Sequence, residues 1–442
     1  MLIQLAQFLA GLSLLIVLHE LGHFIPAKLF KTRVEKFYLF FDYKFSLLKK
    51  KVGGTTYGIG WIPLGGYVKI SGMVDESMDT EGLSKDPEPW EFRAKPGWQR
   101  LIILTGGVIV NFILAIVIYA GMMNYYGESY LPTENIKYGL EVSESLENAG
   151  FQNGDRILSI GGEKMERYSD LKLSLLVGLD EEILIDRNGQ EVSLTMTDTT
   201  IGEIIESGGH SVTYRVPFVV DTVLADGPAA AAGFMNNDSI VAVNNESIVF
   251  FDQFKQALKE STNDTVQVGL YRNGEYMTLA VVPDSSKMIQ LGPNRNPYKY
   301  FNMVDTTYSG WSAVEAGWNK ATRQLGFYIK QFKIIFSPNT GAVKEIGGFR
   351  TMMNQYEENN WNWERFWGVT AFISIMLGFL NILPIPALDG GHVLFTLIEM
   401  ATGKKPSIKF LEIAQTIGFF LLVALLIYAN LNDFNVWDVF RD

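Results

Sequence analysis

The sequence predicts a multi-span α-helical membrane protein that carries a globular α+β insert. Two observations lead to this fold class. Apolar residues gather into four runs long enough to cross a bilayer, and the polar stretch between the second and third runs contains an internal repeat. Hydrophobic residues make up 48% of the 442 positions. Because they are so unevenly placed, membrane helices explain them better than one large soluble core.

Each apolar run predicts one transmembrane helix. The four predicted helices cover residues 1–30, 98–126, 366–400 and 408–431. A cleaved signal peptide is the alternative for the first run, but its basic residues follow the apolar stretch instead of preceding it. The third run is interrupted by Pro384, Pro386 and a pair of glycines. Proline removes a helical hydrogen bond, so we expect a break there.

Basic residues predict the orientation of the four spans. Eight lysines and arginines lie between Lys28 and Lys51, and Lys404, Lys405 and Lys409 lie between the third and fourth spans. The positive-inside rule places both loops in the cytoplasm. Both termini and the globular insert of this multi-pass protein are then expected outside the cytoplasm.

The net charge argues against one class of partner, and the cysteine content excludes two kinds of structural feature. The net charge of −11 argues against a nucleic-acid partner, which would require a basic surface. The absence of cysteine excludes disulfides and cysteine-ligated metals. Only four histidines are present, at positions 19, 23, 210 and 392.

The cytoplasmic loop at 31–97 carries a strand-forming segment. Residues 52–71 combine β-branched and aromatic side chains with frequent glycines, which is typical of a β-hairpin. Two interpretations remain open. The hairpin either forms a re-entrant β-loop beside a polar cavity, where its backbone is satisfied, or lies in the cytoplasm.

The insert contains two copies of one motif. Ala149–Ile157 reads AGFQNGDRI and returns 83 residues later as Ala232–Ile240, AGFMNNDSI. We expect two α+β domains, at 130–212 and 213–285. The pattern A-G-F-x-x-x-D-x-I followed by a short helix resembles bacterial PDZ domains, which bind peptides by strand addition. The alternative is a pair of spacers without a ligand.

A further segment, 307–352, contains aromatic and aliphatic residues at helical spacing from Trp311 to Phe332. This pattern is typical of an amphipathic helix that lies on a membrane interface. A packing brace between the insert and the spans is the alternative.

The first span carries the motif H-E-x-x-H, formed by His19, Glu20 and His23. On a helix, the spacing of four residues puts both imidazoles on one face, as a zinc ion requires. Glu20 then stands where it can take a proton from a zinc-bound water. Ionisable residues inside an apolar span are costly, so they are candidates for a functional site.

A catalytic zinc usually takes three protein ligands, so one more is expected. Asp389 is the only acidic residue between Glu364 and Glu399, and it lies in an apolar stretch. We assign Asp389 as the third ligand, with His392 as its competitor. Asn381 is either functional or an interhelical contact, and Asn111 is expected to be a packing contact.

These motifs resemble one known family. His19–His23, the sequence IPLGGYVKI at Ile62–Ile70 and the sequence NILPIPALDG at Asn381–Gly390 are similar to the site-2 proteases, intramembrane zinc metalloproteases. The resemblance covers nearly the whole chain and implies one zinc ion per chain. It also implies hydrolysis of transmembrane helices after another protease, of the site-1 type, has shortened the substrate.

The family's roles transfer to matching positions. The resemblance implies that His19, His23 and Asp389 bind zinc and that Glu20 is the general base. Asn381 would contact the substrate backbone or its developing oxyanion. Gly58, Ile59 and Gly60 would form the re-entrant β-loop that pairs with an unwound substrate. The implied partners are the lipid bilayer and single-span membrane proteins such as anti-sigma factors or signal-peptide remnants.

Two other functions are compatible with parts of the sequence. One is a membrane-anchored PDZ scaffold whose metal motif is vestigial. The other is a membrane-anchored zinc protease that cleaves soluble unfolded chains. The intact motif argues against the first, and its place inside a span argues against the second.

Overall fold

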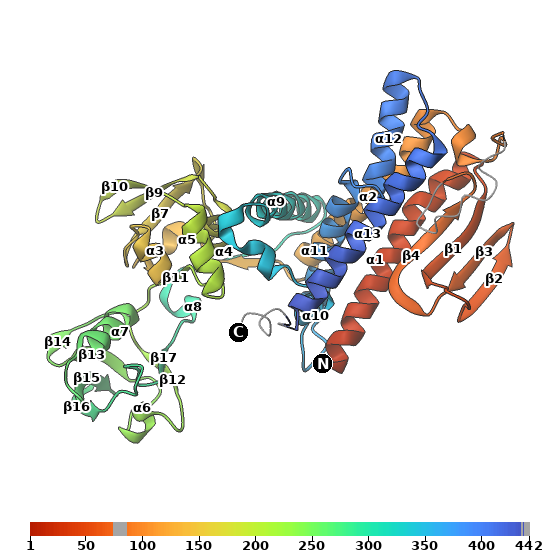
Figure 1. The fold of residues 1–442 in the computed structure, drawn as a ribbon. Helices are drawn as coiled ribbons and strands as arrows, with labels where there is room; N and C mark the ends of the chain where they lie inside the picture. The colour runs from red at the N-terminus through yellow and green to blue at the C-terminus, as the bar shows by residue number, and fades with distance from the viewer. Residues whose placement is uncertain (74–85, 435, 437–442) are drawn as a thin grey trace. The chain divides into compact units, whose positions relative to one another are not determined.

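The computed structural model describes residues 1–73, 86–434 and 436. It divides into two compact units (Figure 1). The first unit contains Met1–Gly127, Thr307–Ile329 and Lys344–Asp442. The second contains Glu128–Thr306 and Lys330–Val343. Residues 74–85 of the predicted 31–97 loop lie outside the described residues.

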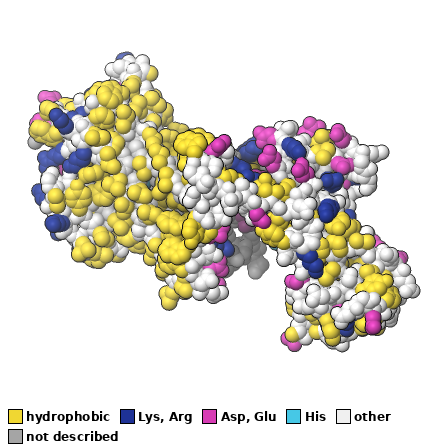
Figure 2. All heavy atoms as spheres, turned by 180° about the vertical axis from the view of Figure 1, so that it is seen from behind, with side chains coloured by type: hydrophobic (Ala, Val, Ile, Leu, Met, Phe, Trp, Pro, Cys, Tyr) yellow, Lys and Arg dark blue, Asp and Glu magenta, His cyan; other side chains and the backbone are white. Residues whose placement is uncertain are grey.

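The first unit is built on long apolar helices. Within the described residues, four helices are long and apolar enough to cross a membrane: α1 (Leu2–Leu29), α2 (Gly97–Tyr125), α11 (Trp363–Ile382) and α13 (Ile408–Asn432). The structure thus contains the four candidate membrane helices that the sequence predicts. Figure 2 shows hydrophobic side chains over a broad face of these helices. Ile113 and Val117 of α2 and Phe420 of α13 are each more than half exposed, as lipid-facing side chains should be.

The predicted third span, 366–400, consists of two helices. After α11 the chain runs irregularly through Pro384 and Pro386, and α12 then begins at Asp389 (Asp389–Thr402). At this break, the first turn of α12 approaches the backbone at the end of α11 closely. A Cβ on Gly390 would lie 2.2 Å from the carbonyl oxygen of Leu383, so only glycine fits there.

Helix α2 packs between α1 and α11 and also contacts α12. A bidentate ion pair joins α2 to α12, in which Arg100 donates to the two carboxylate oxygens of Glu399 at 2.8 and 2.7 Å. Ala321 of α9 (Trp311–Ile335) packs with Ala371 and Ile375 of α11 in a small core. Helix α10 (Phe349–Asn354) and the 3-10 turn η1 (Phe92–Ala94) complete the helical part of this unit.

A four-stranded sheet lies beside α1, and Gly66 on its last strand touches α1 at Ile16. Its strands are β1 (Val34–Phe41), β2 (Leu48–Val52), β3 (Thr55–Ile59) and β4 (Ile62–Ile70). The order is β2-β3-β1-β4, with β1 and β3 parallel and the other pairs antiparallel.

The predicted hairpin over residues 52–71 is wrong in its pairing. The hairpin joins β2 to β3, and β1 separates β3 from β4. Strand β1 takes the central place because it carries buried side chains such as Val34 and Tyr38, whereas β2 is exposed throughout. An exposed, lysine-rich strand is suited to a sheet edge.

The second unit repeats one arrangement twice. Its two four-stranded sheets have the orders β8-β7-β9-β10 and β14-β13-β15-β16, and each repeat has one ten-residue helix, α4 or α7. The strands of the first are β7 (Arg156–Ile160), β8 (Glu163–Lys164), β9 (Glu182–Arg187) and β10 (Gln190–Thr195). Those of the second are β13 (Ser239–Val243), β14 (Glu246–Ser247), β15 (Val266–Arg272) and β16 (Glu275–Val281).

Each sheet is accompanied by a two-stranded ladder. In the first repeat β6 (Leu140–Val142) pairs with β11 (Val212–Tyr214), and in the second β12 (Val220–Val223) pairs with β17 (Leu291–Pro293). The elements of the second repeat thus continue past residue 285, where the second predicted domain ends. The helices are α3 (Glu144–Asn148), α4 (Tyr168–Val177), α5 (Asp198–Glu206), α6 (Pro228–Ala231), α7 (Phe251–Glu260) and α8 (Pro297–Tyr300). Strands β5 (Glu128–Tyr130) and β18 (Val304–Thr306) pair with each other.

The repeated motif has a structural reason. The buried carboxylate of Asp155 accepts two hydrogen bonds from Arg187, at 2.8 and 2.7 Å, and Asp238 accepts the same two from Arg272. Each arginine also donates to the carbonyl oxygen of the motif glycine at 2.8 Å. The aspartate and the glycine of A-G-F-x-x-x-D therefore tie the motif turn to the first strand of the final hairpin, β9 or β15.

Candidate active site

The first unit brings together side chains from three helices around one point. His19 and His23 lie on α1, Asp389 begins α12, and Asn381 lies in the last turn of α11. Helix formation places the two histidines one turn apart. The break after α11 brings Asp389 to them, although it lies 366 positions after His23 in the sequence.

The three predicted ligands meet at close range. Oδ2 of Asp389 lies 3.3 Å from Nε2 of His19 and 3.3 Å from Nε2 of His23. The two Nε2 atoms are 3.2 Å apart. These three residues form a group that could hold a metal ion.

This triangle fits zinc. A tetrahedral zinc lies about 2.0–2.1 Å from nitrogen or oxygen ligands, which separates the ligand atoms by about 3.3 Å. Oδ2 of Asp389 is buried and has no hydrogen-bond partner among the described residues. A buried carboxylate oxygen without a donor is costly, and a cation between it and the imidazoles would satisfy it.

Glu20 lies beside this triangle and lines the same cavity as His19, His23 and Asp389. Its carboxylate interacts with the backbone N–H of Val68 on β4. The cavity has a volume of about 60 Å³, which is enough for a few water molecules. A carboxylate held beside water and a metal site can accept a proton.

Asn381 also faces the site. Its Nδ2 lies 3.4 Å from Nε2 of His19. The amide is thus within reach of a group bound at the triangle and can donate a hydrogen bond to it.

His392, the competitor for the third ligand position, lines the cavity but does not belong to the ligand triangle, which Asp389 completes.

Gly58, Ile59 and Gly60, predicted to bind the substrate, lie outside the lining of the cavity. Gly58 and Ile59 belong to β3, which pairs with β2 on one side and β1 on the other. The N–H of Gly60 donates to the carbonyl oxygen of Leu39 at 2.8 Å. None of the three lines the cavity, whereas Tyr67, Val68 and Ile70 of β4 do. Strand β4 is also the edge of its sheet on this side.

Two features of the site were not predicted from the sequence. One is the placement of β4, which depends on the central position of β1. The other is Asn111 of α2, expected to be a packing contact, whose side-chain amide lies 3.2 Å from Nδ1 of His19. A polar amide inside an apolar span marks Asn111 as a candidate for a polar contact. Only the fold shows that its contact is with His19.

The chain is similar to known proteins over nearly its whole length. The model of a family described as peptidase family M50 matches residues 7–425. The regulator of sigma E protease of Haemophilus influenzae is 26% identical over 453 residues, which cover 98% of each chain.

Two further relatives carry names that describe candidate zinc metalloproteases. The protein of Vibrio cholerae is 25% identical over 454 residues and covers 97% of each chain. The protein of Treponema pallidum is 27% identical over 448 residues, covering 96% of this chain and 97% of its own.

Proposed function

Because this chain belongs to peptidase family M50, the site-2 proteases, and is therefore a zinc metalloprotease of a membrane, we propose that it hydrolyses membrane-spanning helices of single-span proteins. The ligands we propose for zinc are His19, His23 and Asp389, with Glu20 as general base. The observation that carries this proposal is the triangle of ligand atoms 3.2–3.3 Å apart inside the apolar helices.

When bound, zinc supplies Lewis-acid activation of water and of the scissile carbonyl group. The residues of the chain do the rest. Glu20 takes a proton from the attacking water and returns it to the amide nitrogen as the C–N bond breaks. Asn381 donates a hydrogen bond to the oxygen on which negative charge develops.

A substrate helix must first unwind, because its carbonyl groups are engaged in helical hydrogen bonds. We propose that the outer edge of β4, on the side away from β1, binds the unwound segment as an added strand. Its position at the cavity makes it better suited than Gly58, Ile59 and Gly60, since both edges of β3 are already paired. The re-entrant β-loop is thus proposed for the sheet as a whole, with β4 next to the substrate.

The remaining assignments are also part of the proposal. The repeats of the second unit are tandem PDZ-like domains that bind peptide segments or limit access by size, and they lie outside the cytoplasm. The N-terminal part of α9 lies at the outer membrane interface, where Trp311 and Trp318 are exposed. By similarity to the regulator of sigma E protease, the substrates include an anti-sigma factor shortened beforehand by a site-1-type protease.

The test separates zinc binding from catalysis. In Glu20→Gln we expect zinc content close to one per chain and cleavage reduced at least about a thousandfold, because the base is lost while the ligands remain. In Asp389→Ala we expect weaker zinc binding as well. Zinc is measured on purified protein in detergent, and cleavage on a reporter with one membrane-spanning helix.

Glu364→Gln is the matched control, since this exposed glutamate at the start of α11 lies away from the cavity. Unchanged cleavage by Glu20→Gln would rule out the proposed mechanism. Cleavage of unfolded casein in preference to the embedded reporter would instead favour a membrane-anchored protease of soluble chains.

A further inference from the structure

One face of α2 contacts both histidines of the site. Ile103, Gly107 and Asn111 are spaced four residues apart, so they lie along one stripe of the helix. Each of the three meets an imidazole. A Cβ on Gly107 would lie 2.4 Å from Nε2 of His23 and 2.6 Å from Cε1 of His19, which shows how closely the rings approach the helix.

At one end of this stripe, the orientation of His23 is determined by a backbone carbonyl. Nδ1 of His23 lies 2.8 Å from the carbonyl oxygen of Ile103. A carbonyl oxygen only accepts hydrogen bonds, so Nδ1 carries the proton. Nε2, which faces Asp389, is then free to bind a cation.

At the other end, the partner of His19 is a side chain. Nδ1 of His19 lies 3.2 Å from Nδ2 of Asn111, which is fully buried. Oδ1 of the same amide has no hydrogen-bond partner among the described residues. Ser374 donates to the backbone carbonyl of Asn111 at 2.7 Å, so the backbone at this position is itself held in place.

A carboxamide differs from other small polar side chains because one end donates and the other accepts. The two ends have nearly the same shape, so a half-turn about the last side-chain bond exchanges them without moving the helix. With the nitrogen toward His19, the amide donates to an unprotonated Nδ1. With the oxygen toward His19, it accepts from a protonated Nδ1, and Nε2 is then free.

We infer that Asn111 is a positioning residue for His19: its side-chain oxygen accepts the Nδ1 proton and thereby directs Nε2 toward the cation. This inference rests on the proposed function, because it takes His19 as a zinc ligand. Partners of this kind hold a metal-bound imidazole in one tautomer and one orientation. The stripe on α2 then performs the same task for both histidines, through Ile103 and Asn111.

The competing explanation is that Asn111 is only a polar contact between helices. Two substitutions separate the two roles. Asn111→Asp keeps the shape and the acceptor, and Asn111→Leu keeps the approximate volume but removes it. Ser374→Ala is the matched control, because it removes the hydrogen bond to the backbone of Asn111 and leaves the amide next to His19.

The measurement is the zinc dissociation constant of the full chain in detergent, by competition with a chelator. We expect Asn111→Leu to bind zinc about 10–100 times more weakly, and Asn111→Asp to remain within about threefold of the unsubstituted protein. Ser374→Ala should also remain close to it. Thermal unfolding, followed in parallel, reports losses of packing separately.

Unchanged zinc affinity in Asn111→Leu would overturn the inference, and so would an affinity as weak in Asn111→Asp as in Asn111→Leu. If Asn111→Leu does not fold, Asn111→Asp decides alone, since the inference requires it to retain zinc. Asp389→Ala, measured in the same series, identifies a failure of the proposed function. If it binds zinc normally, the ligand set is wrong, whatever Asn111 does.

Discussion

Gly107 illustrates how a residue without a side chain shapes the site. The rings of His19 and His23 occupy the space that a Cβ at this position would need. Because both imidazoles pack against α2 at this position, a methyl group there has to displace at least one of the two rings. A small displacement matters, since a metal site tolerates little error in its ligand positions.

We therefore expect Gly107→Ala to lower zinc affinity and reporter cleavage by at least about tenfold. Gly121→Ala is the matched control on the same helix, because a Cβ at Gly121 meets nothing within 4 Å. Zinc content and cleavage are measured for both variants. Equal behaviour of the two would show that the close approach at Gly107 has no functional consequence.

The two histidines, Glu20 and Asp389 could all be picked out from the sequence. Each is an ionisable residue in an apolar run, and the spacing of H-E-x-x-H is a local property of one helix. Asn111 could not be assigned, because polar amides inside spans commonly serve as packing contacts. Its role depends on which atom of which neighbour it faces, and that neighbour lies 92 positions away.

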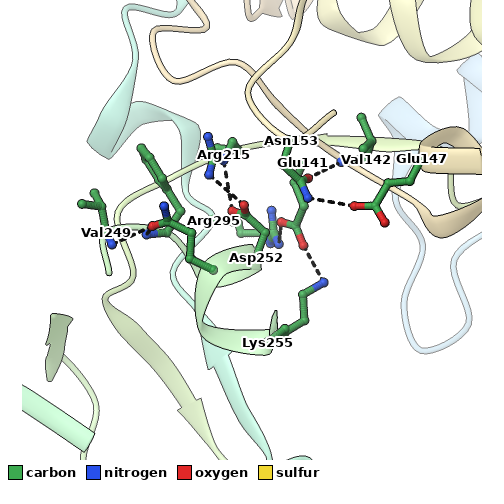
Figure 3. Close-up of polar contacts among 11 residues, drawn as sticks. Glu141, Val142, Glu147, Asn153, Arg215, Val249, Asp252, Lys255 and Arg295 are labelled. Carbon is green, nitrogen blue, oxygen red and sulfur yellow. Dashed lines mark hydrogen bonds and ion pairs between the residues drawn. The ribbon is translucent and has the colours of Figure 1, made fainter. Parts of the chain in front are cut away.

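Within the second unit, ion pairs and hydrogen bonds join the two repeats (Figure 3). Glu141 on β6 of the first repeat accepts from Lys255 on α7 of the second, at 2.7 Å, and also pairs with Arg295, which follows β17. Arg295 further donates to the carbonyl oxygen of Tyr214 at 3.1 Å. Glu141 is only 9% exposed, so its charge depends on these partners.

A second ion pair lies beside the first. Arg215, in the segment between the repeats, donates to both carboxylate oxygens of Asp252 on α7, at 3.0 and 2.7 Å. Its guanidinium group stacks 4.0 Å from the ring centroid of Phe250. Together with Glu141, these contacts join the two repeats through α7.

The charge of Glu141 makes this contact sensitive to pH. Burial raises the pKa of Glu141, but hydrogen bonds and charges from Lys255 and Arg295 lower it by more, so the net pKa lies below its ordinary value. A carboxyl group whose pKa is depressed on folding stabilises the folded form above its unfolded pKa, and this contribution is lost as the pH falls through the folded pKa. The two repeats should therefore loosen in acid.

Because the chain has no cysteine, spin labels can be attached at introduced cysteines alone. We place one label in each repeat, at Glu163→Cys and Glu246→Cys, and measure the distance between the two labels. We expect a narrow distribution of this distance at pH 7, and a broader one as the pH falls below the usual carboxyl range. When Glu141→Gln is added to the labelled protein, the distribution should already be broad at pH 7. Glu147→Gln is the control, because Glu147 bonds Asn153 within the first repeat. A narrow distribution in Glu141→Gln would contradict this expectation.

The helices and the repeat could be predicted because both depend on local patterns. The pairing of strands in the first unit could not. Residues 52–71 contain two strands of the sheet, but neither pairs with the other, since β1 comes between them. Strand order depends on which strand has the most apolar surface to bury, and that is a property of the whole sheet.

For the molecule as a whole, the orientation in the membrane is the assignment that most affects function. The lysines of β2 should lie in the cytoplasm and the repeats outside, because basic residues are retained on the cytoplasmic side. We expect a membrane-impermeant thiol reagent added to intact spheroplasts to label Glu163→Cys, and to label Lys50→Cys only after the membrane is opened. Both positions are exposed in the structure. Labelling in the reverse order would invert the topology.

The sequence determined the class of this protein: four apolar helices, a repeated insert, and an H-E-x-x-H motif placed where a charge is costly. Those features are local, because hydropathy and helical spacing act over neighbouring residues. Only the tertiary structure decided that Asp389, and not its competitor His392, completes the group with the two histidines, that β4 borders the cavity, and that Asn111 faces His19. Each of these depends on how segments far apart in the chain pack, since helices approach closely only where residues such as Gly107 and Gly390 leave room.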